Sequence, residues 1–220
     1  HVAAGKLVST EADAFWLPDT SGTDYRRRHT KTTIVVAQMD LEAHKIGYFH
    51  NAGYFELGGE DFAGLFRTNL PEDPAFLPLF AEVVRLDRIE RLSETELARH
   101  SLGLLRTHFP RRPLSNPVAA FGARFARDLP ELQDRGLDFY HLWAFSTIRQ
   151  LGAAAELAAL NLEWLADQRV LDARRAATDF TAIASGAKSL ILKGARAVNS
   201  RRPLDVAAPC GEMSSAWDRA

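Results

Sequence analysis

The stretch that decides the fold is Thr32-Thr33-Ile34-Val35-Val36-Ala37, followed by the turn residues Asp40-Leu41-Glu42-Ala43 and the returning segment Lys45–Phe49. The first segment is β-branched and apolar at successive positions, which is typical of a strand buried on both faces. The four turn residues can reverse the chain, and a pairing of Asp40 with Lys45 would join the two segments as an antiparallel hairpin. We therefore predict strands at 32–37 and 45–49.

Strand-like sequence also precedes this hairpin. Residues 6–17 (KLVSTEADAFWL) end at Pro18, and residues 19–24 have the composition of a loop. Gly58-Gly59 ends the strand-rich section, and residues 60–67 (EDFAGLFR) predict a short helix whose acidic start suits the helix dipole. Residues 68–78 contain three prolines and are expected to form a surface loop. This order predicts a small antiparallel sheet with one short helix.

The second half of the chain has a helical pattern. Ser93 and Glu96 occupy the N-cap and capping-box positions of a helix that reaches about His108. Further helices are predicted at about 118–129, 137–167 and 169–197. In the last two helices apolar residues recur at alternating steps of four and three, and many of them are alanines. This spacing predicts an antiparallel pair whose backbones approach closely.

The segment 108–117 (HFPRRPLSNP) is the predicted boundary between the two halves. We therefore predict an α+β protein in three parts. Residues 1–109 form the strand-rich part, residues 110–198 form the helical part, and residues 199–220 form a poorly ordered tail because they lack periodicity.

Charge and composition limit the kinds of partner. The chain of 220 residues has a formal net charge of −1, so no global field attracts nucleic acid or a membrane surface. No apolar run approaches the ~20 residues of a membrane helix, and the start is not a signal peptide. There is a single cysteine, Cys210, which excludes an internal disulfide framework. These features favour the cytoplasm. The absence of a first methionine leads us to expect a segment upstream of His1.

His29 is the first candidate for chemistry, because it stands where the predicted loop enters the buried strand. An imidazole there could act as a general base, since its usual pKa lies near working pH. The alternative is a surface histidine at the end of the basic run Arg26–His29. A third interpretation is a metal site with His44, His50 and Glu56. Their spacing matches no metal-ligand signature, so no metal is predicted.

Other polar residues receive structural interpretations. Arg149 and Glu156 lie two turns apart in a predicted helix, too far for direct pairing, and we expect a structural polar network there. Gly152 between them indicates close packing or a ligand. Cys210 has no obvious base beside it and is not predicted to be a nucleophile. Paired arginines such as Arg111-Arg112 are interpreted as solvated faces, because no aromatic residues interleave them for nucleic-acid binding.

Four segments together resemble a known bacterial family: Ala12–Asp19, Asp24–Thr33, Gly47–Tyr54 and Phe145–Glu156. The family is the domain of unknown function 1839, whose members tend to be encoded near amino acid:carrier protein ligases. An aromatic-Leu-Pro strand end, a loop to a histidine and a second strand ending in Asp or Asn are also similar to the papain-like fold of butirosin-type acyltransferases. Those enzymes move an aminoacyl group from the phosphopantetheine thiol of a carrier protein.

The second resemblance implies a papain-like strand-rich half, with His29 as the base and Asn51 as the residue that orients it. Simple extension of the hairpin pairing instead places Glu56 opposite His29, and a one-residue bulge would reverse this, so both orienting residues stay open. The resemblance also implies a cysteine nucleophile from an upstream helix. The expected function is an aminoacyl or acyl transferase that acts with a carrier protein and needs no cofactor. The alternative is a non-catalytic module that binds a carrier protein or its ligase. The sequence does not indicate an oligomeric state.

Overall fold

The computed structural model describes residues 1–71 and 79–220, and it divides into two compact units, His1–Arg91 and Leu92–Ala220. The division falls after Arg91 and not after residue 109. Helix α2 (Glu94–His108) belongs to the second unit because Ala98 and Leu102 are buried against Leu165. The predicted loop at 68–78 lies mostly outside the described residues. The α+β class is confirmed.

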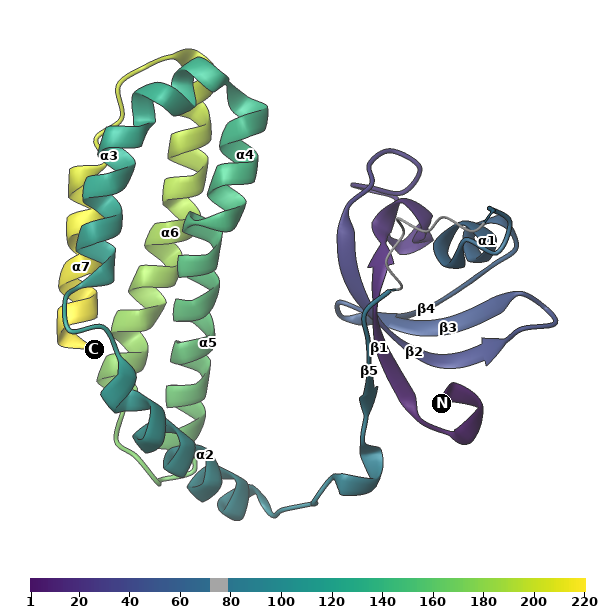
Figure 1. The fold of residues 1–220 in the computed structure, drawn as a ribbon. Coiled ribbons are helices and arrows are strands. Elements are labelled where there is room, and N and C mark those ends of the chain that lie inside the picture. Colours follow the sequence, from purple (N-terminus) through teal and green to yellow (C-terminus); the bar gives the residue numbers. More distant parts are fainter. Residues whose placement is uncertain (72–78) are drawn as a thin grey trace. The chain divides into compact units, whose positions relative to one another are not determined.

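The first unit is a five-stranded antiparallel sheet with one short helix (Figure 1). The strands lie in the order β4-β3-β2-β1-β5. Their bounds are β1 Leu7–Asp13, β2 Lys31–Asp40, β3 Lys45–His50, β4 Gly53–Gly58 and β5 Ala81–Val84, and helix α1 is Glu60–Phe66. Short 3₁₀ turns lie at Val2–Ala4, Ala14–Trp16, Pro18–Thr20 and Leu86–Arg88. The predicted hairpin is confirmed, with Asp40 opposite Lys45.

One face of the sheet carries the core of this unit. Ile34 and Val36 on β2 alternate with exposed or half-buried neighbours, so the prediction that this strand is buried on both faces is wrong. Side chains from β1, β3, β4, α1 and the segment before β2 complete the core: Ala12, Ile46, Tyr48, Leu57, Phe62, Leu65 and Leu17. This alternation is usual for an antiparallel sheet with a single packed face.

A bulge in β2 changes which side chains reach this inner face. Val36 lies opposite Tyr48 and Gln38 lies opposite Gly47, so Ala37 is an extra residue in the ladder. Beyond the bulge Met39 is paired with Ile46, whose side chain belongs to the core. Val36 and Met39 therefore share the inner face although they are three residues apart.

The second unit is helical throughout (Figure 1). After α2 and a 3₁₀ turn at Phe109–Arg111 come α3 Pro117–Arg135, α4 Leu137–Ser146, α5 Ile148–Asp167, α6 Arg174–Ser200 and α7 Ala207–Arg219. The single helix predicted at 137–167 is divided at Thr147, which has φ −127° and ψ −83°. The Thr147 hydroxyl donates to the Trp143 carbonyl at 2.7 Å, the kind of local bond that competes with a regular helix.

Helices α5 and α6 form the predicted antiparallel pair. Gly152 allows the close approach, because a Cβ at this position would lie 3.1 Å from the Cβ of Ala187. Glu156 pairs with Lys188 of α6 at 2.9 Å, and the guanidinium of Arg149 lies 5.1 Å from the Phe145 ring centroid. Each of the two charged residues therefore has a separate partner at the surface.

The tail predicted to be poorly ordered contains a packed helix instead. Cys210, Met213 and Ala216 are one turn apart on α7 and are buried in the helical core. Gly122 of α3 makes room for this helix, since a Cβ there would lie 2.6 Å from the Cβ of Cys210. Burial raises the pKa of the Cys210 thiol.

Among the residues described, no helix is both long and apolar enough to cross a bilayer.

Two helical glycines test the packing of the second unit. A Cβ at Gly194 would lie 2.2 Å from the hydroxyl oxygen of Tyr140, a fully buried residue that donates to the Ile191 carbonyl. We expect Gly194→Ala to lower the free energy of unfolding by about 1–3 kcal/mol through overpacking. Gly103→Ala on α2 is the control, because its Cβ meets nothing within 4 Å. It should raise stability by about 0.5–1 kcal/mol. Urea unfolding measures both effects. If both substitutions stabilised the protein, the close contact between Gly194 and Tyr140 would be contradicted.

Candidate active site

His29 is held at the surface of the first unit by Asp13, the last residue of β1. Its Nδ1 lies 2.6 Å from Oδ2 of Asp13, and its ring stacks on Phe15 with centroids 4.4 Å apart. Asp13 is itself oriented, because its Oδ1 accepts the Phe15 backbone N–H at 3.1 Å. The side chain of His29 is 69% exposed and that of Asp13 is 34% exposed. One ring nitrogen is therefore engaged by a carboxylate while the ring remains accessible.

Neither residue expected to orient His29 does so within the described part of the chain. Asn51 begins the turn between β3 and β4 with a left-handed φ of +50°, and its amide nitrogen lies 3.4 Å from Nε2 of His50. Glu56 is exposed on β4 opposite Gly47. The pairing that placed Glu56 opposite His29 is wrong, because the turn after His50 sends β4 back along the far edge of β3. Asp13 occupies the orienting position instead.

A second histidine lies in a buried network below this surface. His50 Nδ1 is 2.5 Å from Oδ2 of Asp19, and the Tyr48 hydroxyl donates to Oδ1 of Asp19 at 2.5 Å. On the other side of the ring, Nε2 lies 3.0 Å from the Thr32 hydroxyl oxygen. The side chains of His50 and Asp19 are only 5% and 4% exposed. Because it is buried, His50 is not accessible to a substrate, whereas His29 is.

The hydrogen-bond inventory assigns the protons of this network. The Asn51 amide nitrogen at 3.4 Å and the Thr32 hydroxyl at 3.0 Å can both donate to Nε2 of His50, which fits a ring that accepts at this nitrogen. In that tautomer Nδ1 carries the ring proton and donates a hydrogen bond to Asp19. The Asp19 carboxylate then accepts hydrogen bonds from both His50 and Tyr48 of β3. Burial, followed by the hydrogen bond to Asp19, raises the pKa of Tyr48 well above its usual range. The network therefore keeps the phenol neutral and the carboxylate satisfied.

The segment that carries His29 is fixed to its surroundings at several points. Arg26 pairs with Asp61 of α1 at 2.6 Å, and its guanidinium lies 4.6 Å from the Trp16 ring centroid. The Tyr25 hydroxyl also donates to Asp61, at 3.0 Å. Within the segment, the Thr20 hydroxyl contacts the carbonyl of Leu17 at 2.9 Å. Together with the bonds of Asp19, these contacts hold the connection between β1 and β2 in one conformation.

Sequence reasoning selected His29 but missed Asp13, Asp19 and the role of His50. His50 had a detectable signal, because it continues the inner-face alternation of Ile46 and Tyr48, and a buried histidine requires polar partners. The two aspartates gave none, since Asp13 comes near His29 only when β1 pairs with β2, and Asp19 reaches His50 only when the segment between these strands packs on β3. Within residues 1–71 and 79–220, no three His, Cys, Asp or Glu side chains lie close enough together to hold a metal ion.

The fold and site define a two-unit α+β protein with an oriented surface histidine. The family model of the DUF1839 N-terminal domain matches residues 1–86, and that of the DUF1839 C-terminal domain matches residues 94–220. The chain belongs to the DUF1839 family. The junction of the two family domains coincides with the division of the structure after Arg91. No curated protein matches the chain.

The two aspartates provide a matched test of the buried network. Asp19→Ala would leave the Tyr48 hydroxyl and the His50 Nδ1–H without their buried acceptor, which should lower the free energy of unfolding by about 2–5 kcal/mol. Asp13→Ala removes a more exposed partner and should cost about 1 kcal/mol. Urea unfolding followed by circular dichroism measures both. Equal losses would contradict the assignment of Asp19 as a structural anchor.

Tyr48 predicts how stability changes at alkaline pH. A tyrosine in the unfolded chain ionises with a pKa of about 10, whereas the raised pKa of Tyr48 keeps the folded phenol neutral. Stability from this group is therefore fully present below about pH 10 and is lost as pH rises, by about 1.4 kcal/mol per pH unit. Tyr48→Phe should be the less stable protein at neutral pH, and its deficit should shrink above about pH 10. A constant deficit across this range of pH, measured by urea unfolding, would contradict the prediction.

Proposed function

We propose that the first unit supplies the acid–base group of a papain-like aminoacyl or acyl transferase, which acts with a carrier protein in the cytoplasm. The observation that carries this proposal is the exposed His29 ring, held through Nδ1 by Asp13. A nucleophile's base must be accessible, and a third group must orient it. His29 meets both requirements, whereas His50 is buried.

In this mechanism Nε2 of His29 takes the proton of a thiol. The resulting thiolate attacks the carbonyl carbon of the acyl group, which the carrier protein holds as a thioester. The bond between that carbon and the carrier sulfur then breaks, and the departing thiolate takes the proton from His29 and leaves as the free thiol of the carrier. Asp13 accepts the Nδ1–H throughout, so it fixes the tautomer that leaves Nε2 as the base and stabilises the imidazolium.

The attacking thiol is not assigned to Cys210. That residue is buried on α7 in the second unit, and burial raises its pKa, so the reactive thiolate is disfavoured. The proposal therefore requires a thiol from outside the 220 residues. The resemblance to butirosin-type enzymes suggests the carrier-protein thioester as the acyl donor, and it leaves the acyl group and its acceptor unspecified.

A second candidate function is a non-catalytic module that binds a carrier protein or its ligase. The observation that favours it is a groove of about 870 Å³ in the second unit, lined by apolar side chains such as Leu105 and Phe109 and by two arginines, Arg106 and Arg112. The arginines are balanced by Asp172 and Asp218 in the same lining, so the groove suits a partner with an apolar contact surface and polar groups around it. In this case His29 would not be needed for binding.

The two functions are distinguished by His29→Ala in a protein that includes the required thiol. If His29 is the base, transfer from an alanyl-loaded carrier protein should fall by about 10²–10⁴-fold. The fold should be unchanged, because the side chain is exposed. Asp13→Ala should reduce transfer by a smaller factor, since it disturbs only the orientation of the ring.

His100→Ala, at an exposed histidine of α2, serves as the control and should retain full activity. Loss of the loaded carrier protein is followed by mass spectrometry. Unchanged turnover in His29→Ala would remove His29 from the mechanism, and carrier binding without turnover in the parent protein would favour the binding module.

A further inference from the structure

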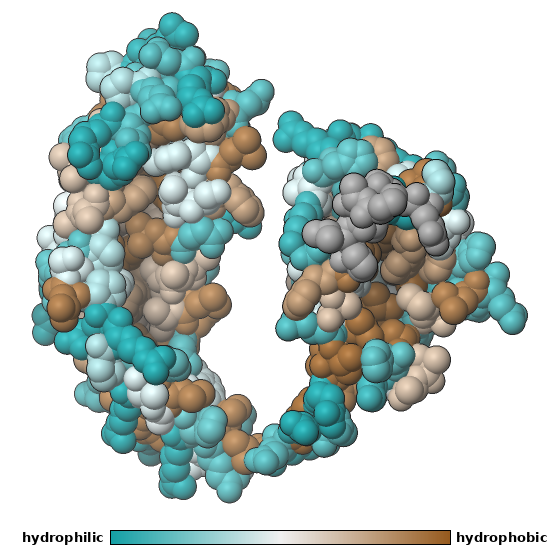
Figure 2. All heavy atoms as spheres, in the orientation of Figure 1, coloured by the Kyte–Doolittle hydropathy of each residue, from teal (hydrophilic) through white to brown (hydrophobic). Residues whose placement is uncertain are grey.

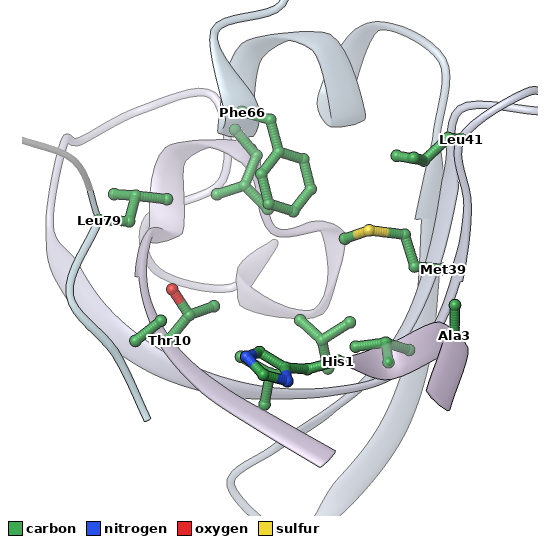
Figure 3. A pocket seen from close by; sticks show the side chains of 12 residues that line it. His1, Ala3, Thr10, Met39, Leu41, Phe66 and Leu79 are labelled. Carbon is green, nitrogen blue, oxygen red and sulfur yellow. The ribbon is translucent and has the colours of Figure 1, made fainter. Parts of the chain in front are cut away.

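We propose that the first unit contains a binding site for an aliphatic chain of a small molecule, such as the hydrocarbon of a fatty acid. The site is a cavity of about 590 Å³ between the inner face of the sheet, the 3₁₀ turn Val2–Ala4 and helix α1 (Figure 3). Small-molecule pockets in proteins have volumes of roughly 300–1,000 Å³. The cavity therefore has the size of a ligand site.

Several elements line this half-open cavity. Val8 of β1 and Val36 of β2 contribute from the sheet, and Leu65 and Phe66 contribute from α1. Figure 3 shows Phe66 and Met39 reaching from α1 and β2 toward the same space above Thr10. Because strands, helix and turn all contribute, the cavity is a concave site and not the exposed face of a single element. Brown apolar residues gather on this unit in the space-filling view as well (Figure 2).

The bulge in β2 gives the cavity one of its walls. Without the extra residue at Ala37, the alternation of the strand would direct Gln38 inward and Met39 outward. The bulge reverses this order and directs the flexible thioether of Met39 into the cavity. Bulges commonly re-aim side chains at functional sites, and methionine adapts its shape to apolar ligands.

The lining specifies the chemistry of the ligand. Of the lining residues that the structure describes, only His1 and Thr10 have polar side chains. The Thr10 hydroxyl is already used, since it lies 3.2 Å from the Phe80 carbonyl oxygen and 3.3 Å from that of Glu11. The His1 imidazole is the other polar side chain at the cavity, where a carboxylate or another polar head can meet it, and the remaining walls offer apolar contact.

This inference does not rest on the role of His29, so it can be tested by binding alone. The probes are butanoate, hexanoate, octanoate and decanoate, each titrated below its micelle concentration into the full-length protein by calorimetry. Because each buried methylene adds a nearly constant free energy, affinity should rise about three- to fourfold per added carbon, with a negative heat-capacity change. Absence of binding, or affinity independent of chain length, would overturn the proposal.

Two substitutions place the ligand in this cavity. Met39→Asp introduces a charge into the apolar wall, and Ala81→Trp fills space from β5, and each should weaken octanoate binding at least about tenfold. The controls are their exposed neighbours on the opposite face, Gln38→Asp and Glu82→Trp, which should bind as the parent does.

Circular dichroism confirms that each protein is folded before it is titrated. Parent-like binding by the folded Met39→Asp and Ala81→Trp proteins would overturn the assignment to this cavity. An equal loss of binding in the control proteins would overturn it as well.

Discussion

The carboxylate of Asp19 is the constraint on which the first unit depends. It is buried in a 3₁₀ turn between β1 and β2, and it accepts hydrogen bonds from two side chains of β3, Tyr48 and His50. An unpaired carboxylate at this depth would cost several kcal/mol, so the turn can be buried only when β3 is in register. The bonds therefore couple the hairpin to the segment that precedes it. They also account for the burial of Tyr48 and His50 on this face.

This coupling separates the roles of two histidines that have the same type of partner. Each imidazole contacts an aspartate through Nδ1, but His50 also has Thr32 at Nε2 and lies inside the core. Its bonding capacity is used, and a ring of this kind maintains structure. His29 lies outside on the segment that Asp19 anchors, where Asp13 and Phe15 hold it while it remains accessible. The same type of His–Asp pair is thus buried and structural at one place and accessible to solvent at the other.

Local sequence patterns predicted much of the fold. The hairpin with Asp40 opposite Lys45 and the capping box at Ser93 and Glu96 are present in the structure. Each depends on residues that are near one another in the chain. The helix break at Thr147 was not predicted, because the apolar pattern continues through it. The helix at Ala207–Arg219 was missed because its buried face is small and mixed, and it is stable only against α3 and α6. Tertiary packing decides both features.

The candidate site was predicted only in part for the same reason. The partner of His29 was expected on the hairpin, whereas only the antiparallel pairing of β1 with β2 brings Asp13 to it, with Asp13 opposite Lys31.

The protonation of the His29 ring tests the central claim most directly. Long-range ¹H–¹⁵N correlation NMR of the histidine rings distinguishes the two neutral tautomers, which a heavy-atom structure assigns only by inference. If Asp13 orients His29 as a base, the neutral ring carries its proton on Nδ1 and leaves Nε2 unprotonated, and Asp13→Ala removes this preference. A neutral His29 protonated on Nε2 in the parent protein would contradict the account.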